Sequence, residues 1–162
     1  MSRVKTMLPQ LRFEGFSDEW VNKKVGDFGA VKMCKRIFKD QTSDKEKIPF
    51  YKIGTFGGIP DAYISEELYK EYLEKYPYPE VGDILISAAG TIGRTVIYNG
   101  EKAYYQDSNI VWLDHDKRSL SNAFFYQFLE VTNWNELEGS TIKRLYNSHL
   151  LGRSEEHTSE LQ

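Results

Sequence analysis

Two glycines in the segment Gly90-Thr91-Ile92-Gly93 raise the question of a phosphate-binding loop. A P-loop ends in Gly-Lys-Ser/Thr and opens a helix, whereas Gly93 is followed by Arg94, Thr95 and further residues typical of a strand. A dinucleotide-binding loop needs a third glycine and a following helix, so it is excluded on the same grounds. The segment is expected to be a tight connection at which a strand reverses, with Arg94 beside it.

Residues for covalent or metal chemistry are sparse. Cys34 is the single cysteine, which excludes an internal disulfide and fits a reducing compartment. Cys34 with His115 or His149 would suit a nucleophile and its base, but isolated residues of these types are most often structural. Zinc sites need more ligands than remain, and no lysine follows an acid by two residues, as nuclease sites often require. The sequence predicts no catalytic residue, no metal and no cofactor.

Three stretches, residues 87–94, 104–109 and 141–147, are rich in groups that contact nucleic acids. Arg suits guanine edges, Asn and Gln suit adenine, and Lys suits phosphates. Such residues also populate ordinary loop surfaces. The net charge of −3 gives no overall basic footprint, although residues 1–60 carry +5 and residues 61–162 carry −8. A basic face is therefore compatible with the sequence without being established by it.

The elements that would position these loops follow from the pattern of the chain. Residues 65–76 and 122–131 have apolar positions at helical spacing, with Ser65 and Ser121 as caps. Short strands are expected within residues 31–38 and 48–53, before Gly90 and around residues 108–114. Asn99-Gly100 between apolar runs predicts a hairpin with a type I′ turn.

One domain of residues 1–152, incomplete at its C-terminal end, is expected. The last ten residues, RSEEHTSELQ (153–162), read like the translation of a common sequencing adapter and are expected to be an artefact. No apolar stretch approaches the roughly 20 residues that span a bilayer, and no secretory signal opens the chain. We expect a cytoplasmic protein with no membrane partner.

Four blocks, in order, resemble the specificity subunit of type I restriction-modification systems, and more narrowly its N-terminal target recognition domain. They are LRFEGFSDEW, IPFYKIGTFGGIPDAYIS, YPEVGDILISAAGTIGRTVIYNGEKAYYQDSNIVWL and GSTIKRLYNSHL. The resemblance covers nearly all of residues 8–151. It implies an α/β (α+β) domain with a curved, largely antiparallel sheet, flanking helices, and loops that lie along the major groove of double-stranded DNA.

The resemblance also implies partners and a division of labour. Such a subunit performs no chemistry itself; its long helices hold two methyltransferase subunits, and a motor-nuclease subunit joins for cleavage. The connecting helix and the second recognition domain of the family are absent from this sequence.

Candidate DNA contacts are chosen by side-chain chemistry within the matched blocks. Lys143 and Arg144 would mainly contact phosphates, while Gln106 and Asn109 would either read base edges or only cap loops. The full set is Lys52, Thr55, Arg94, Gln106, Ser108, Asn109, Lys143, Arg144 and Asn147. Two alternatives stay open: a protein-interaction module that docks through the aromatic segment 13–20, and a small enzyme that uses Cys34.

Overall fold

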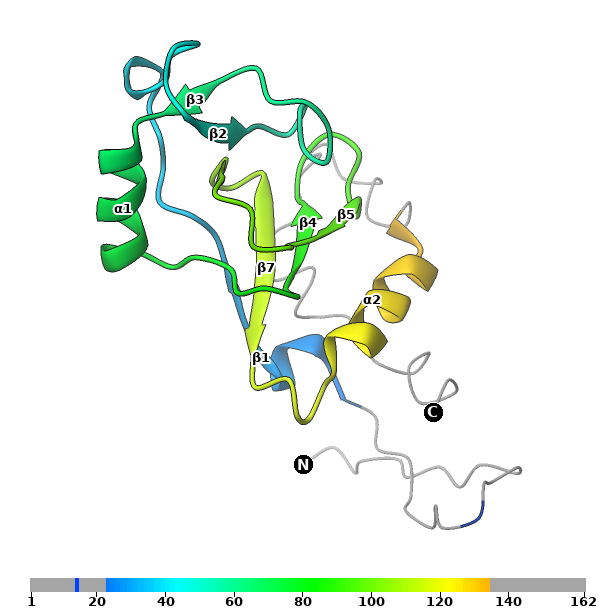
Figure 1. Cartoon of the computed structure of the whole chain (residues 1–162). Coiled ribbons are helices and arrows are strands. Elements are labelled where there is room, and N and C mark those ends of the chain that lie inside the picture. Colours follow the sequence, from blue (N-terminus) through cyan, green and yellow to red (C-terminus); the bar gives the residue numbers. More distant parts are fainter. Residues whose placement is uncertain (1–13, 15–22, 135–162) are drawn as a thin grey trace.

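The computed structural model describes residue 14 and residues 23–134 of the chain. The described part contains short helices and short strands joined by loops (Figure 1). In chain order they are η1 (Val25–Asp27), β1 (Gly29–Lys32), η2 (Lys39–Gln41), β2 (Ile48–Tyr51), β3 (Tyr63–Ile64), α1 (Glu66–Lys75), β4 (Ile84–Ser87), β5 (Thr95–Ile97), β6 (Tyr104–Tyr105), β7 (Ile110–His115) and α2 (Asn122–Val131). Within these residues, neither α1 nor α2 has the length and apolar character needed to cross a membrane.

The strands are divided between two sheets. One has the order β1-β7-β4-β5 and the other the order β3-β2-β6. Every strand pair is antiparallel except β2 with β6, which is parallel. The expected mixed α/β domain with largely antiparallel pairing is confirmed, with the strands in two sheets rather than one.

Strands β4 and β7 lie between two hydrophobic cores. Alternate side chains of a strand point to opposite faces, so Ile84 and Ile86 of β4 join one core while Leu85 joins the other. Helix α2 covers the first face, and β2, β3 and α1 lie on the opposite side (Figure 1). Burial on both faces explains why β4 and β7 are nearly continuous apolar runs.

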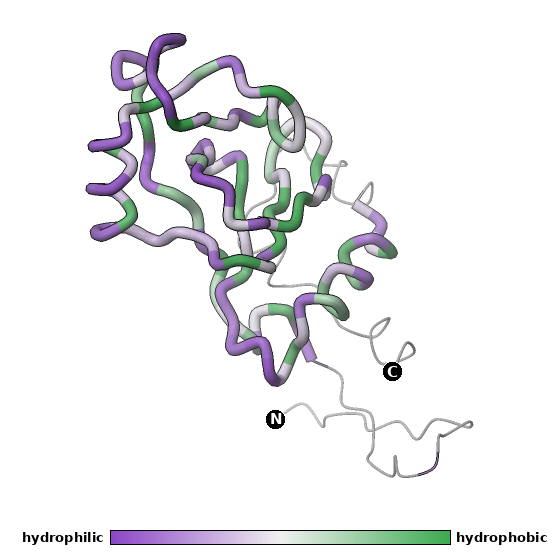
Figure 2. The backbone as a smooth tube through the Cα atoms, viewed as in Figure 1, coloured by the Kyte–Doolittle hydropathy of each residue, from purple (hydrophilic) through white to green (hydrophobic). Residues whose placement is uncertain are grey.

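Both predicted helices are confirmed to within one residue at each end. Ser65 accepts a hydrogen bond from the Leu68 amide at 3.1 Å, and Ser121 accepts one from the Phe124 amide at 3.2 Å. These caps satisfy amides that have no partner within the helix. The outward side of α1 is hydrophilic, whereas hydrophobic segments gather in the interior of the molecule (Figure 2). Of the apolar side chains of α1, Tyr69 is the one that is buried.

The predicted hairpin at Asn99-Gly100 is wrong. Strand β5 pairs with β4, whereas β6 pairs with β2 in the other sheet, so the two strands do not form a ladder with each other. A type I′ turn needs positive φ at both central residues, and Ser108 and Lys117 are the described non-glycine residues with positive φ. The aromatic side chains of β6 are buried in the core beside β2, which draws the chain to that sheet.

The strand expected within residues 31–38 is also shorter than predicted. Strand β1 ends at Lys32, and the chain then leaves the ladder while Cys34 and Ile37 still enter the core. An apolar pattern indicates burial, and here burial continues without strand pairing.

Candidate nucleic-acid interface

Two loops meet where β7 begins. Residues 106–109 lead into Ile110, the first residue of β7, and Ile110 pairs with Ser87 at the end of β4. Because β4 runs antiparallel to β7, the connection 88–94 leaves β4 at the same end. The Ala88 amide donates to the main-chain oxygen of Asn109 at 2.7 Å, which joins the two loops directly.

Two further loops reach the same end of the molecule. Strand β1 runs antiparallel to β7 and ends beside Trp112, so residues 33–36 emerge there. Strand β2 is parallel to β6, and its last residue is level with Tyr105, so the turn 52–56 follows beside residue 106. We call residues 33–36, 52–56, 88–94 and 106–109 the loop cluster. Six of the nine predicted contacts lie in it, whereas Lys143, Arg144 and Asn147 fall outside the described residues.

The glycine segment is confirmed as the tight connection between β4 and β5. The Ser87 hydroxyl donates to the Thr91 carbonyl at 2.6 Å and accepts from the Arg94 amide at 2.8 Å. Gly90 and Gly93 have φ of +64° and +87°, a region that side chains disfavour. A Cβ on Gly93 would also collide with the indole of Trp134. The two glycines are therefore needed for the backbone conformation of this connection.

Arg94 braces one loop against another. Its guanidinium donates to the carbonyl oxygen of Phe56, and its Cζ lies 5.7 Å from the centroid of the Phe56 ring. Phe56 is fully buried, so this contact fixes the turn 52–56 to the β4–β5 connection. A DNA contact by Arg94 stays a prediction.

Lys52 and Thr55 have different roles in their turn. The Thr55 hydroxyl accepts from the Lys52 amide at 2.9 Å and so holds the turn closed. The Lys52 ammonium pairs with Asp61 at 2.9 Å, with 40% of the Lys52 side chain exposed. A hollow of about 400 Å³ opens beside this pair, and Phe50 and Gln106 contribute to its lining. Lys52 thus presents a partly exposed cation at the rim of the loop cluster.

The predicted readers in residues 106–109 are held unequally. Gln106 Oε1 accepts from the Ile53 amide at 3.0 Å, so Gln106 does cap a loop. Ser108 has φ of +61° and donates to the carboxylate of Asp107 at 3.2 Å. The half-buried Asn109 side chain has no hydrogen-bond partner within the described part of the chain. Base reading by Gln106 and Asn109 and a DNA contact by Ser108 stay predictions.

The charge of the loop cluster is opposite to that of the chain. It holds four cations and one carboxylate: Lys35, Arg36, Lys52, Arg94 and Asp107. Arg36 was missed by the sequence analysis, since its partner Asp107 lies 71 residues away. Pairing of β1 with β7 brings Arg36 and Asp107 together, and no short sequence pattern predicts that contact.

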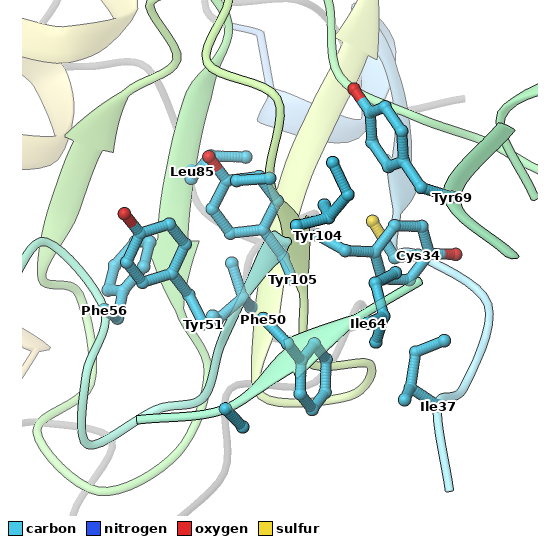
Figure 3. Close-up of a cluster of buried hydrophobic side chains, with 14 of the residues drawn as sticks. Cys34, Ile37, Phe50, Tyr51, Phe56, Ile64, Tyr69, Leu85, Tyr104 and Tyr105 are labelled. Carbon is cyan, nitrogen blue, oxygen red and sulfur yellow. The ribbon is translucent and has the colours of Figure 1, made fainter. Parts of the chain in front are cut away.

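The Cys34 chemistry that the sequence left open is disfavoured. Cys34 is 2% exposed within the aromatic core (Figure 3), and this burial raises the pKa of its thiol to about 12. His115 packs instead against Phe125, on the α2 side of the sheet. His149 lies outside the described residues, in which no group of three or more metal-ligating side chains occurs.

Comparison with known proteins gives a consistent assignment. Residues 17–151 match the family model for the type I restriction modification DNA specificity domain. The chain is 53% identical over 151 residues to the Haemophilus influenzae protein named "Putative type I restriction enzyme specificity subunit S.HindORF215P". The match spans 89% of this chain and 39% of that relative.

Solved structures share the fold at low sequence identity. The HsdS subunit from Thermoanaerobacter tengcongensis matches with a TM-score of 0.58 and 17% identity, over 92% of this chain and 35% of that one. The type I restriction-modification S subunit from M. genitalium gives 0.56 and 16%, over 91% and 36%. A chain from a study of assembly of the type I R-M system gives 0.62 and 17%, over 92% and 36%. With a family model that covers most of its length, the chain belongs to the type I restriction modification DNA specificity domain family.

Proposed function

We propose that this chain recognises double-stranded DNA as a target recognition domain and performs no catalysis itself. The loop cluster would lie on the DNA, with Lys52 and other cations at phosphates and the side chains of residues 106–109 near base edges. The observation that carries this proposal is the concentration of four cations and one carboxylate in loops at one end of a chain whose net charge is −3.

The proposed partners follow from family membership. The chain spans 39% of the length of its Haemophilus influenzae relative, and we propose that contacts with other subunits would be made by segments of a full-length protein outside this chain. In the full-length protein we assign methylation and cleavage to methyltransferase and motor-nuclease subunits, directed to their site by this domain.

The test is a titration of the chain against a labelled mixed-sequence duplex as salt is raised, read by fluorescence anisotropy. Each phosphate contact contributes roughly −0.9 to the slope of log affinity against log salt concentration, so binding should weaken steeply. Lys52→Ala should make the slope shallower by about that amount. Absence of binding even at low salt would reject the proposal for this chain.

Lys70→Ala is the matched control. Lys70 lies on α1 and pairs with Glu66 at 3.4 Å, outside the loop cluster. Lys70→Ala removes the same charge from the chain as Lys52→Ala does, so the total charge cannot account for a difference in DNA binding between the two variants. Equal effects of the two substitutions would mean that the loop cluster is not the DNA-facing surface.

A further inference from the structure

The side chain of Arg36 is anchored to residues 106–109 of the loop cluster through Asp107. Its Nε donates to Oδ2 of Asp107 at 3.0 Å, and the Arg36 side chain remains 59% exposed while that of Asp107 is 14% exposed. One edge of the guanidinium is therefore held by the protein, and the rest faces outward beside residues 106–109.

Asp107 is itself fixed by its own loop. The Ser108 hydroxyl donates to the same Oδ2 at 3.2 Å, and the Asn109 amide donates to the Asp107 carbonyl at 2.7 Å. The carboxylate is thus a rigid support, and a planar guanidinium bound to it through Nε has its direction set.

The terminal amino groups of Arg36 have no protein partner within the described residues. The other three cations of the loop cluster have partners. Arg94 donates to the Phe56 carbonyl, Lys52 pairs with Asp61, and the Lys35 ammonium lies 5.2 Å from the centroid of the Tyr76 ring. Arg36 therefore offers an unused fork of donors where the predicted readers lie. Two acceptors fit such a fork in DNA, the O6/N7 edge of guanine and a phosphate.

We propose that Arg36 reads a guanine in the major groove through its terminal amino groups, with Asp107 as the positioning residue. This inference rests on the proposed function. The adjacent carboxylate favours the base over the phosphate, because its charge repels an approaching phosphate anion more strongly than the uncharged guanine. A phosphate contact would also not need a supported guanidinium, since a flexible lysine supplies the charge.

The experiment selects bound duplexes from a randomised pool with the chain and its variants, followed by sequencing of the bound DNA. The unsubstituted chain should enrich a guanine at a defined position. Arg36→Ala should reduce the preference for that guanine roughly 10- to 100-fold and leave the other positions unchanged. Arg36→Lys keeps the charge but lacks the fork, so it should lose the same preference.

Asp107→Asn and Arg118→Ala complete the design. Asp107→Asn should weaken the preference at the same position only, since Arg36 is present but less firmly oriented. Arg118 is an exposed arginine in the turn beyond the other end of β7, and its substitution should leave the selected sequence unchanged. Thermal unfolding of each variant separates a lost base preference from a lost fold.

The outcomes distinguish the inference from the function on which it rests. A uniform loss of affinity for all sequences in Arg36→Ala would identify a phosphate contact and overturn the guanine assignment. An unchanged selection in Arg36→Ala would overturn it as well, while DNA recognition by the domain stands. If the unsubstituted chain binds no DNA at low salt, the proposed function fails, and this inference fails with it.

Discussion

The guanidinium of Arg94 donates to the main-chain oxygen of Phe56 and lies over the ring of the same residue. One side chain thus satisfies a carbonyl in a fully buried residue and covers its aromatic face. The glycine connection and the turn 52–56 are held together by this contact. Arg94, one of the candidate DNA contacts chosen from the sequence, is part of the scaffold of the loop cluster.

Arg94→Met should lower the free energy of unfolding by about 1–3 kcal/mol, because it leaves the Phe56 carbonyl without its donor. Urea denaturation measures this. Arg118→Met is the control, since Arg118 is exposed and its hydrogen bond to Asp116 uses the main-chain amide. Equal stabilities of the two variants would contradict a bracing role.

Gly93→Ala should destabilise the fold, whereas Gly54→Ala should not. Alanine at the φ of +87° found at Gly93 costs about 1–2 kcal/mol, and its Cβ would also collide with the Trp134 indole. A Cβ at Gly54 meets no atom within 4 Å, so the substitution should be neutral or stabilise the fold slightly. Urea denaturation of both variants decides this; equal unfolding free energies would show that the connection adapts.

Patterns carried by neighbouring residues were predictable. The caps Ser65 and Ser121 and the apolar spacing behind them predicted both helices. The apolar runs before Gly90 and around residues 108–114 predicted β4 and β7. Each depends on a signal a few residues long. Strand partners depend on the whole core, which is why the Asn99-Gly100 signal failed.

In the candidate site too, features that depend on single residues could be predicted, whereas features that depend on long-range contacts could not. Loop residues with suitable side chains could be chosen from the sequence, and residues 52–55, 94 and 106–109 do meet in one place. Whether a side chain faces outward or holds a neighbouring loop is set by long-range contacts. Gln106 to Ile53 and Arg36 to Asp107 are two such contacts, formed only when β2 and β1 take their places in the sheets.

Lys117→Met should destabilise the fold through the carboxylate that it leaves behind. Lys117 pairs with Glu80 at 2.6 Å and with Asp83 at 3.2 Å, and the Asp83 side chain is 5% exposed. Leaving that buried carboxylate without its cation should cost about 1–3 kcal/mol. Lys75→Met, which removes an exposed pair with Glu71 on α1, should cause no measurable loss in the same urea assay. A Lys117 variant as stable as the Lys75 variant would contradict this.

The thiol of Cys34 should be nearly unreactive in the folded protein at pH 8. A pKa raised from 9.0 to about 12 lowers the thiolate fraction at that pH roughly a thousandfold, and burial blocks access as well. Reaction with a thiol-specific disulfide reagent, in buffer and in urea, measures the difference. Rapid reaction in buffer would contradict this prediction and would support the alternative function, a small enzyme that uses Cys34.

The same pKa shift sets a direction for stability at alkaline pH. The unfolded Cys34 thiol loses its proton near pH 9, whereas the folded thiol keeps it to about pH 12. The stability that this difference contributes to the folded state is therefore fully present below pH 9. It is lost as pH rises from 9 toward 12. Cys34→Ala should therefore make the decline in unfolding free energy over that range shallower by up to about 1.4 kcal/mol per pH unit.

Gln106→Ala and Asn109→Ala should separate loop capping from base reading. Gln106→Ala removes the acceptor of the Ile53 amide, so it should lower the unfolding free energy by about 0.5–1.5 kcal/mol and weaken binding to every duplex. Asn109→Ala removes a side chain without a hydrogen-bond partner in the described residues, so stability should hold. Its binding should relax at one base pair, measured by selection from a randomised pool. A uniform loss across all sequences in Asn109→Ala would reject Asn109 as a reader.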